Sequence, residues 1–382
     1  MRNKIIIGCL LLGALSAKAQ DTRLSAVEYK ERVLEYSRQI KQSSEERIAM
    51  QHAIKAANAG GQIYNNYKAA QVQGKITEQA EELTTDNIVY SADLNYWTAA
   101  ARKGMYDVMC QYVDIVGELA NVLTIRFNDG QISKTDLLQV ESRLKEAELN
   151  KSSAYKEYQI ALQNLNSLMG VSPLDPIEVE DSITTYLALP LQVGEDVALR
   201  NRPDYAISEL NIEYQKRQIN LSKAKYNPSL AIGFQGTWGT PMLNVKGSDQ
   251  LWTPAVFASL KIPLFRWGAR FKEVNSQKAI LRSKEYALDN TRDKIAQEVA
   301  NAWTSLTEYT KQITVAEEAC KIAEENLDLN TFSYNEGKLP ILDVLSAQLS
   351  WIQSYSSLIQ TWYQQKASLA QYNKAIGIRR LQ

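Results

Sequence analysis

Few residues of this chain have the types and spacing that catalysis or metal binding requires. The sequence holds one histidine, His52, and three cysteines, Cys9, Cys110 and Cys320, which lie far apart. A zinc site, a Cys/His nucleophile or a disulfide framework needs such residues in clusters. No pair of acidic residues has a reason to face a common cleft, as general acid–base catalysis requires. We therefore expect no catalytic residue, no metal site and no cofactor, and predict that the protein is not an enzyme.

The carboxylates that do recur in a pattern are Asp136 and Asp343. Residues 126–138 and 333–345 share an aromatic residue, a glycine, an aspartate and a leucine at equal spacings, and the two glycines lie 207 residues apart. The same offset pairs Gly61 with Gly268, Thr84 with Thr291, Ile115 with Ile322, Leu162 with Leu369, Asn166 with Asn373, and Gly170 with Gly377. A shared offset over so long a span indicates a tandem structural duplication.

The duplicated segment has the features of a tight turn between two helices. Glycine takes the left-handed conformation at little cost, so Gly130 and Gly337 are predicted to end long helices. A second helix then begins, with Asp136 or Asp343 in its first turn, where the helix dipole favours a negative charge. This local role is a sufficient explanation for both aspartates, and it makes each repeat a helical hairpin with a short tip.

The elements that position these turns are unusually long helices. Residues 268–334 contain neither Pro nor any Gly after the first, and these 67 residues would form a helix of about 100 Å at ~1.5 Å per residue. A return helix is expected over about 341–376, where apolar residues recur at threes and fours. The same stripes would fit an ordinary helical bundle, but the helix length favours a coiled coil or a helical tube.

Two segments of the second half alternate in the manner of strands, at about 229–238 and 252–265. Each is apolar on one side, and Trp238 and Trp252 stand where the segments approach each other. Strands of roughly ten residues with aromatic ends predict a transmembrane β-hairpin. A soluble hairpin with one face in a core fits the alternation as well.

Residues 1–19 have the composition of a secretory signal peptide. Arg2 and Lys4 precede an apolar run over 5–15, and residues 17–19 form a small-x-small cleavage site. We predict that the mature protein is exported, which favours the membrane interpretation of the hairpin. No other stretch is expected to be apolar enough for a transmembrane helix. The 43 basic and 43 acidic residues balance and form no basic block, so nucleic acid is not an expected partner.

The predicted organisation is therefore a first repeat over 20–178 and a second over 179–382. The first repeat lacks a counterpart of the β-hairpin. Its junction near 59–61 is shorter than the equivalent part of the second repeat by 39 residues, about the size of two strands and their turn.

In this order and spacing, the motifs resemble those of the TolC-type outer-membrane efflux proteins. The resemblance rests on the duplicated turn at 127–138 and 334–345, on Asn-Arg-Pro-Asp (201–204), on Tyr-Asn-Pro-Ser (226–229) and on the segment 262–268. It covers the mature chain except for the missing first hairpin.

The resemblance implies a mainly α fold in which tandem long helical hairpins form a trimeric periplasmic α-barrel. It also implies that each chain contributes its β-hairpin to a shared barrel in the outer membrane, in contact with lipid. The implied function is the exit duct of a tripartite efflux or type I secretion system. The implied partners are two further copies, a periplasmic adaptor protein and, indirectly, an inner-membrane pump.

Site residues are implied at the hairpin tips. Asp343 matches an aspartate ring at the constricted aperture, and Ser346 stands where the family has a second aspartate. Asp136 and Tyr334 match two members of a hydrogen-bonded lock that holds the aperture shut. The arginine position of that lock is Leu339, with Lys338 or Lys134 as possible substitutes. The positions implied for adaptor docking are Gly130, Leu138, Gly337 and Leu345.

The missing hairpin also supports a second interpretation, a periplasmic coiled-coil scaffold or a degenerate duct protein that forms no barrel. Three chains with two strands each supply six strands, fewer than the about eight of the smallest usual membrane barrels.

Overall fold

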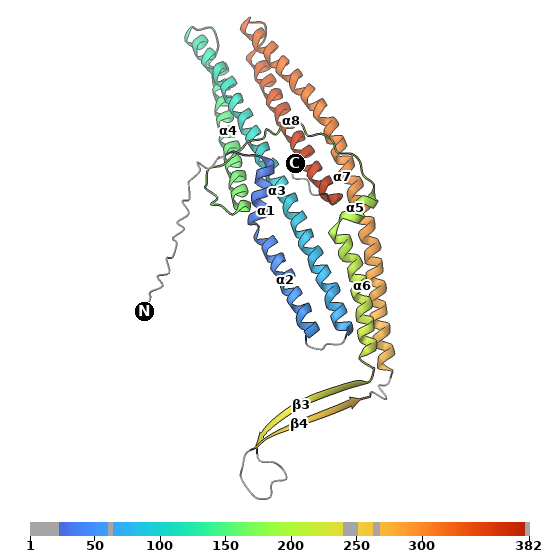
Figure 1. The fold of residues 1–382 in the computed structure, drawn as a ribbon. Helices are drawn as coiled ribbons and strands as arrows, with labels where there is room; N and C mark the ends of the chain where they lie inside the picture. The colour runs from blue at the N-terminus through green and yellow to red at the C-terminus, as the bar shows by residue number, and fades with distance from the viewer. Residues whose placement is uncertain (1–22, 60–63, 240–250, 263–267, 379–382) are drawn as a thin grey trace, which may run out of the picture.

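The computed structural model describes residues 23–59, 64–239, 251–262 and 268–378. The predicted signal peptide, residues 1–19, lies outside the described residues. The chain forms a mainly helical body from which one β-hairpin projects (Figure 1). The helices are α1 (Ala26–Tyr36), α2 (Arg38–Ala59), α3 (Tyr64–Asn128), α4 (Lys134–Met169), α5 (Glu195–Asn201), α6 (Pro203–Ala224), α7 (Ala269–Asn335) and α8 (Ile341–Ala375). The strands are β1 (Arg23–Leu24), β2 (Glu178–Val179), β3 (Ser229–Gly239) and β4 (Leu251–Lys261).

Two long hairpins, α3 with α4 and α7 with α8, have their tips at the same end of the molecule (Figure 1). Towards the other end, α2 packs on α3, α3 on α6, and α6 on α7, so four helices lie side by side. The central helix, α3, contacts α2, α4, α6 and α8. Its buried side chains recur at threes and fours along the helix, as expected for a helix packed on several sides.

The apolar stripe of α8 forms much of the main core. Leu345, Ile352, Ile359 and Trp362 are buried there, whereas Leu349, which the sequence places on the same stripe, is 39% exposed. The stripe packs between α7 and α3, because α8 contacts both helices. Long helices with such a stripe are stabilised mainly by this burial and not by helix propensity.

A second, smaller core joins α5, α7 and the end of α8. Helix α5 ends before Arg202, and α6 begins at Pro203, the residue that suits the first position of a helix. The guanidinium of Arg202, only 11% exposed, contacts the carboxylates of Asp204 and Glu298, each at 2.6 Å. It also donates to the Ala375 carbonyl at 3.3 Å, so one side chain connects α6, α7 and α8.

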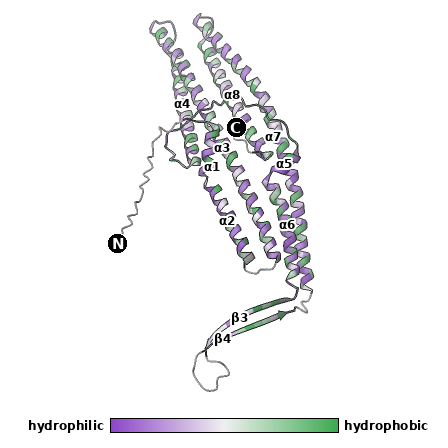
Figure 2. Ribbon diagram, in the orientation of Figure 1, coloured by the Kyte–Doolittle hydropathy of each residue, from purple (hydrophilic) through white to green (hydrophobic). Residues whose placement is uncertain are grey.

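Strands β3 and β4 pair in antiparallel register, from Ser229 opposite Lys261 to Trp238 opposite Trp252. The hairpin stands apart from the helices, and its apolar residues are conspicuous in the hydropathy view (Figure 2). Leu230, Ile232, Phe234 and Val256 are between 65% and 75% exposed. The expected second strand extended to about residue 265, but β4 ends at Lys261, and residues 263–267 lie outside the described part of the chain.

The two halves differ at the end opposite the tips. Helices α2 and α3 are separated by residues 60–63, which lie outside the described residues, whereas residues 225–268 separate α6 from α7 and include both long strands. The expected junction near 59–61 falls at this short connection.

One sequence expectation is corrected by α3. Among the described residues, this helix is long and apolar enough to cross a membrane by length and composition, although no such stretch was expected. The expectation overlooked that a helix contacting five others, α1, α2, α4, α6 and α8, is apolar on several faces.

Candidate functional site: the two hairpin tips

The first tip joins α3 to α4 through a left-handed glycine. Gly130 has a φ of 75°, and its amide donates to the Phe127 carbonyl at 2.9 Å. The next amide, of Gln131, donates to the Arg126 carbonyl at 2.8 Å. This pair of hydrogen bonds satisfies carbonyls at the end of α3 that would otherwise lack partners.

The second tip repeats this arrangement between α7 and α8. Gly337 has a φ of 73° and donates to the Tyr334 carbonyl at 2.9 Å, while the Lys338 amide donates to the Ser333 carbonyl at 2.9 Å. Each of the four groups lies 207 residues after its counterpart in the first tip. The two tips therefore have the same local backbone design.

The aspartates after the two turns have different surroundings. Asp136 forms a capping box with Ser133: the Asp136 amide donates to Ser133 Oγ at 3.1 Å, and Ser133 Oγ donates to Asp136 Oδ2 at 2.9 Å. Asp343 follows Pro340, which has no side chain able to form such a cap. The carboxylate of Asp136 is thus used to begin α4, and that of Asp343 is not used in this way.

Asp343 and Ser346 are both exposed, in the first two turns of α8. The intervening Val344 and Leu345 are buried. The two polar residues therefore face outward together, beside an apolar side of the same helix. Within the described residues, no group of three or more His, Cys, Asp or Glu side chains could hold a metal ion.

A contact between the two tips involves Arg126, a residue that sequence reasoning did not select. Its guanidinium carbon lies 5.2 Å from the ring centroid of Tyr334, and its Nη2 donates to Asn335 Oδ1 at 3.2 Å. Tyr334 is only 7% exposed, so its ring is held within this contact. Arg126 thereby connects the end of α3 to the end of α7.

The structure does not bring Asp136 and Tyr334 together within this one chain. No hydrogen bond joins them among the described residues, and the Asp136 carboxylate is engaged with Ser133. Lys134 and Lys338 are exposed. Arg126 is the cation that lies on the Tyr334 ring, and its place on another helix explains why the local motif did not indicate it.

The two leucines at equivalent tip positions differ in exposure. Leu138 is 52% exposed, whereas Leu345 is 6% exposed and belongs to the main core. Leu138 lines a groove of about 520 Å³ between α3 and α4, together with Ala120, Asn121, Thr124, Glu141, Ser142, Leu144 and Lys145. Gly130 and Gly337 face open space, because a Cβ added at either would meet no atom within 4 Å.

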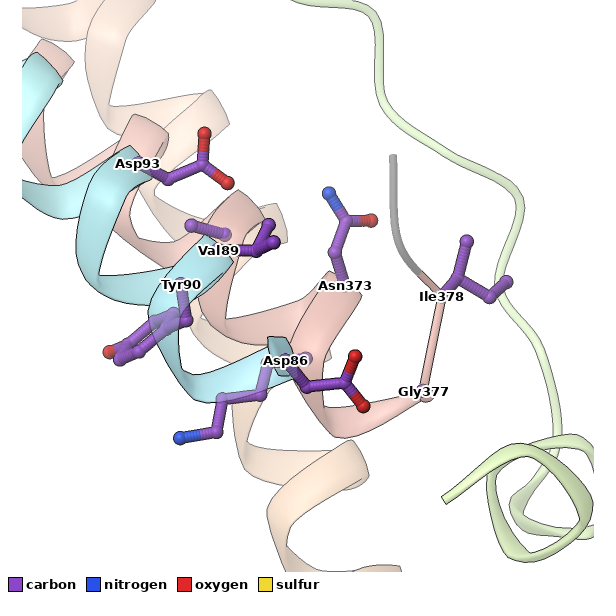
Figure 3. A pocket seen from close by; sticks show the side chains of 9 residues that line it. Asp86, Val89, Tyr90, Asp93, Asn373, Gly377 and Ile378 are labelled. Atoms are coloured by element: carbon purple, nitrogen blue, oxygen red, sulfur yellow. The ribbon is translucent and has the colours of Figure 1, made fainter. Parts of the chain in front are cut away.

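A crevice between α3 and the end of α8 is too small for a ligand (Figure 3). Its volume is about 20 Å³, enough for roughly one water molecule. Asp93, which lines it, pairs with the buried Lys30 at 3.0 Å, and burial raises the pKa of the Asp93 carboxyl despite that pairing. This crevice is therefore part of the packing between helices.

Buried polar residues also fasten the segment that links α4 to α5. Lys366, 1% exposed, donates to the Thr185 carbonyl, and its Nζ lies 4.8 Å and 5.3 Å from the rings of Trp97 and Trp362. Burial lowers the pKa of Lys366 from 10.5 to about 8, against an opposite influence of Asp181. Lys366 lies among polar residues of α8, so the sequence pattern did not indicate that it is buried.

Comparison with known proteins identifies relatives of this architecture. Residues 196–378 match the family model described as outer membrane efflux protein. The chain is 25% identical over 260 residues to nodulation protein T of Rhizobium leguminosarum bv. trifolii, covering 66% of this chain and 55% of that protein. It is 20% identical over 303 residues to the outer membrane efflux protein BepC of Brucella suis, covering 79% and 65%. The chain thus spans between about half and two thirds of the length of these curated relatives.

Solved structures share the fold along most of the chain. A membrane protein from Pseudomonas aeruginosa superimposes with a TM-score of 0.81 at 16% identity, covering 92% of both chains. The outer-membrane channel OprN has a TM-score of 0.80 at 13% identity, covering 92% and 90%. The outer membrane protein VceC from Vibrio cholerae has a TM-score of 0.79 at 16% identity, covering 92% and 96%. At these identities the similarity establishes the fold.

Proposed function

Residues 196–378 match the outer membrane efflux protein family, and from that match we propose that the chain is the outer-membrane exit duct of a tripartite efflux or type I secretion system. It conducts solutes passively to the exterior, from an inner-membrane pump and a periplasmic adaptor. The observation that carries this proposal is the placement of two equivalent hairpin tips at one end and an exposed apolar β-hairpin at the other (Figure 1). The family and the fold are those of channel proteins and not of enzymes.

The dimensions of the hairpin support its placement in the outer membrane. Strands β3 and β4 have 11 residues each, and a tilted transmembrane strand needs about 9–11. Their exposed apolar side chains would be costly in water but suit lipid. The helical body then extends into the periplasm.

Uncovered apolar residues on the helices support assembly with further copies of the chain. On α7, Val315, Ile322 and Leu329 recur every seven residues and are between 59% and 67% exposed. A seven-residue apolar repeat is typical of a coiled-coil contact between helices. Such a stripe without a partner in one chain needs a helix of a neighbouring chain to cover it, so we propose that copies assemble side by side into a homotrimeric tube.

At the tips, the proposed aperture is lined by Asp343 and Ser346 and is held closed by contacts between neighbouring helices. The Arg126 contact with Tyr334 supports this, since it supplies the cation that the local motif lacks at Leu339. Asp136 contributes to the same region by holding the start of α4. Opening then requires the two hairpins to separate at their tips.

The groove beside Leu138 supports adaptor docking at the tip. It is long enough along α3 and α4 to receive apolar side chains of a partner helix, and Leu138 offers an exposed apolar surface within it. Gly130 and Gly337 leave the turns free of side chains, so a partner can approach the backbone. Leu345 contributes by packing α8 and not by direct contact.

The single β-hairpin supports the second candidate, a periplasmic scaffold that forms no barrel. Cell fractionation separates the two: the duct requires the full chain in the outer membrane as an oligomer that resists mild SDS, and purified protein that conducts ions in planar bilayers. A protein recovered only as a soluble periplasmic monomer would exclude the duct and favour the scaffold.

A further inference from the structure

A shallow groove between α6 and α7 is lined by four basic side chains and by no acidic one. Its volume is about 420 Å³. The cations are Lys216, Lys223, Lys278 and Arg282, and all four are exposed. No ion pair involves any of them within the part of the chain that the structure describes.

Two acidic residues near this groove have other partners, whereas Glu285, one turn beyond Arg282, forms no ion pair among the described residues. Glu213 pairs with Arg217 at 3.3 Å, and Glu273 pairs with Lys225 at 3.1 Å. Four like charges at one surface repel one another and create a positive potential that attracts anions. The groove is therefore a site for an anionic partner.

The position of the groove indicates which anion it meets. Lys223 lies in the last turn of α6, six residues before the first residue of β3 at Ser229. Lys278 is nine residues beyond the first residue of α7, which is about 14 Å at ~1.5 Å per residue. The groove therefore lies near the end of α6 and α7 at which the β-hairpin leaves the helices. Figure 1 shows this end of the two helices. If the hairpin crosses the outer membrane, this surface faces the headgroups of the periplasmic leaflet.

We propose that this groove binds the phosphate groups of anionic phospholipids at the periplasmic face of the outer membrane. This inference rests on the proposed membrane location of the hairpin. Ammonium and guanidinium groups form charge-assisted hydrogen bonds with phosphate oxygens, and their long stems reach towards the headgroup layer. Beneath them, Ile219 and Leu281 give the groove an apolar floor, which can contact the glycerol and upper acyl carbons.

The test measures lipid binding by the purified full chain in an uncharged detergent. Short-chain phosphatidylglycerol is titrated in, with short-chain phosphatidylcholine and inorganic phosphate in parallel. The variant Lys223→Gln/Lys278→Gln removes two charges from the groove. The control Lys156→Gln/Lys321→Gln removes two exposed charges of α4 and α7 far from the hairpin.

Each basic residue at an anionic lipid surface contributes a factor of about five in affinity, so the groove variant should bind phosphatidylglycerol roughly 25-fold more weakly. The control should stay within about twofold, and phosphatidylcholine should bind weakly to all. Equal phosphatidylglycerol affinity in the groove and control variants would overturn the proposal. Inorganic phosphate binding as tightly as the lipid would assign a free-anion site instead, and displacement of the lipid by an acidic helical peptide would assign a protein partner.

A separate readout keeps this result distinct from the proposed function. Because the substituted side chains are exposed, the groove variant should keep the thermal midpoint of the parent and should still fractionate with the outer membrane. A parent protein absent from the outer membrane contradicts the duct. A parent present there with unchanged lipid affinity in the groove variant contradicts the lipid site alone.

Discussion

Replacing Arg126 by alanine should destabilise the closed arrangement of the hairpin tips. The substitution removes a cation 5.2 Å from the Tyr334 ring centroid and a hydrogen bond of 3.2 Å to Asn335. A cation–π contact near the surface contributes about 0.5–1 kcal/mol, and a hydrogen bond of this kind about 1 kcal/mol. The closed state should therefore lose about 2 kcal/mol, which is roughly a thirtyfold increase in the ratio of open to closed channels.

Single-channel recording of the purified full chain in planar bilayers measures that ratio directly. Tyr334→Phe keeps the aromatic ring and should change it little, whereas Tyr334→Leu should raise it. The control Arg143→Ala removes an arginine whose ion pair, with Glu146, lies within one helix, and should leave the ratio unchanged.

A double-mutant cycle with Arg126→Ala and Tyr334→Leu isolates the contact between the two side chains. The coupling energy should be about 0.5–1 kcal/mol. Additive effects of the two substitutions, with no coupling, would refute the reasoning, because they would mean that the ring and the cation act independently on opening.

Three further predictions concern the stability of the full chain in detergent. The pKa of Lys366 is about 8 in the folded chain, against an ordinary 10.5. Between these pH values the unfolded chain binds more protons, so the free energy of unfolding should rise with pH across that window. Lys366→Met should abolish this rise, measured as the thermal midpoint at several pH values. Gly337→Ala should cost about 1–2 kcal/mol in unfolding free energy because its φ is positive. Gly194→Ala, in equally open space at a φ of −74° but at the N-cap of α5, should cost clearly less. Arg202→Ala removes two ion pairs from a side chain that is 11% exposed and should lower the unfolding free energy by about 3 kcal/mol, measured by urea titration.

Features set by local chemistry could be anticipated from the sequence. The absence of Pro, the absence of Gly after residue 268 and the glycine turn that follows indicated a helix over about 268–334. Helix α7 occupies Ala269–Asn335. Alternation indicated strands at about 229–238 and 252–265, and β3 and β4 occupy Ser229–Gly239 and Leu251–Lys261. The mainly helical fold and the resemblance to outer-membrane efflux proteins are confirmed.

Contacts between distant segments were not encoded in such local patterns. Arg126 and Tyr334 meet only because α3 and α7 end side by side, and nothing near Arg126 distinguishes it from a solvated arginine. Likewise, Leu138 and Leu345 occupy equivalent positions in the duplicated turn. Leu345 is buried because α8 packs against both α7 and α3, whereas α4 packs mainly against α3 and leaves Leu138 uncovered.

The same asymmetry bears on how copies of this chain could build a duct. Both halves end in tips with matching hydrogen bonds, so each can contribute to a closure at that end. At the other end, only residues 60–63 separate α2 from α3 in the sequence, and the hairpin of β3 and β4 belongs to the second half. In the proposed ring, every copy would supply two helical hairpins and, from its described residues, one β-hairpin. Since a closed barrel is the arrangement that leaves no strand edge exposed to lipid, the strand number available to the ring decides whether the tube opens through the outer membrane.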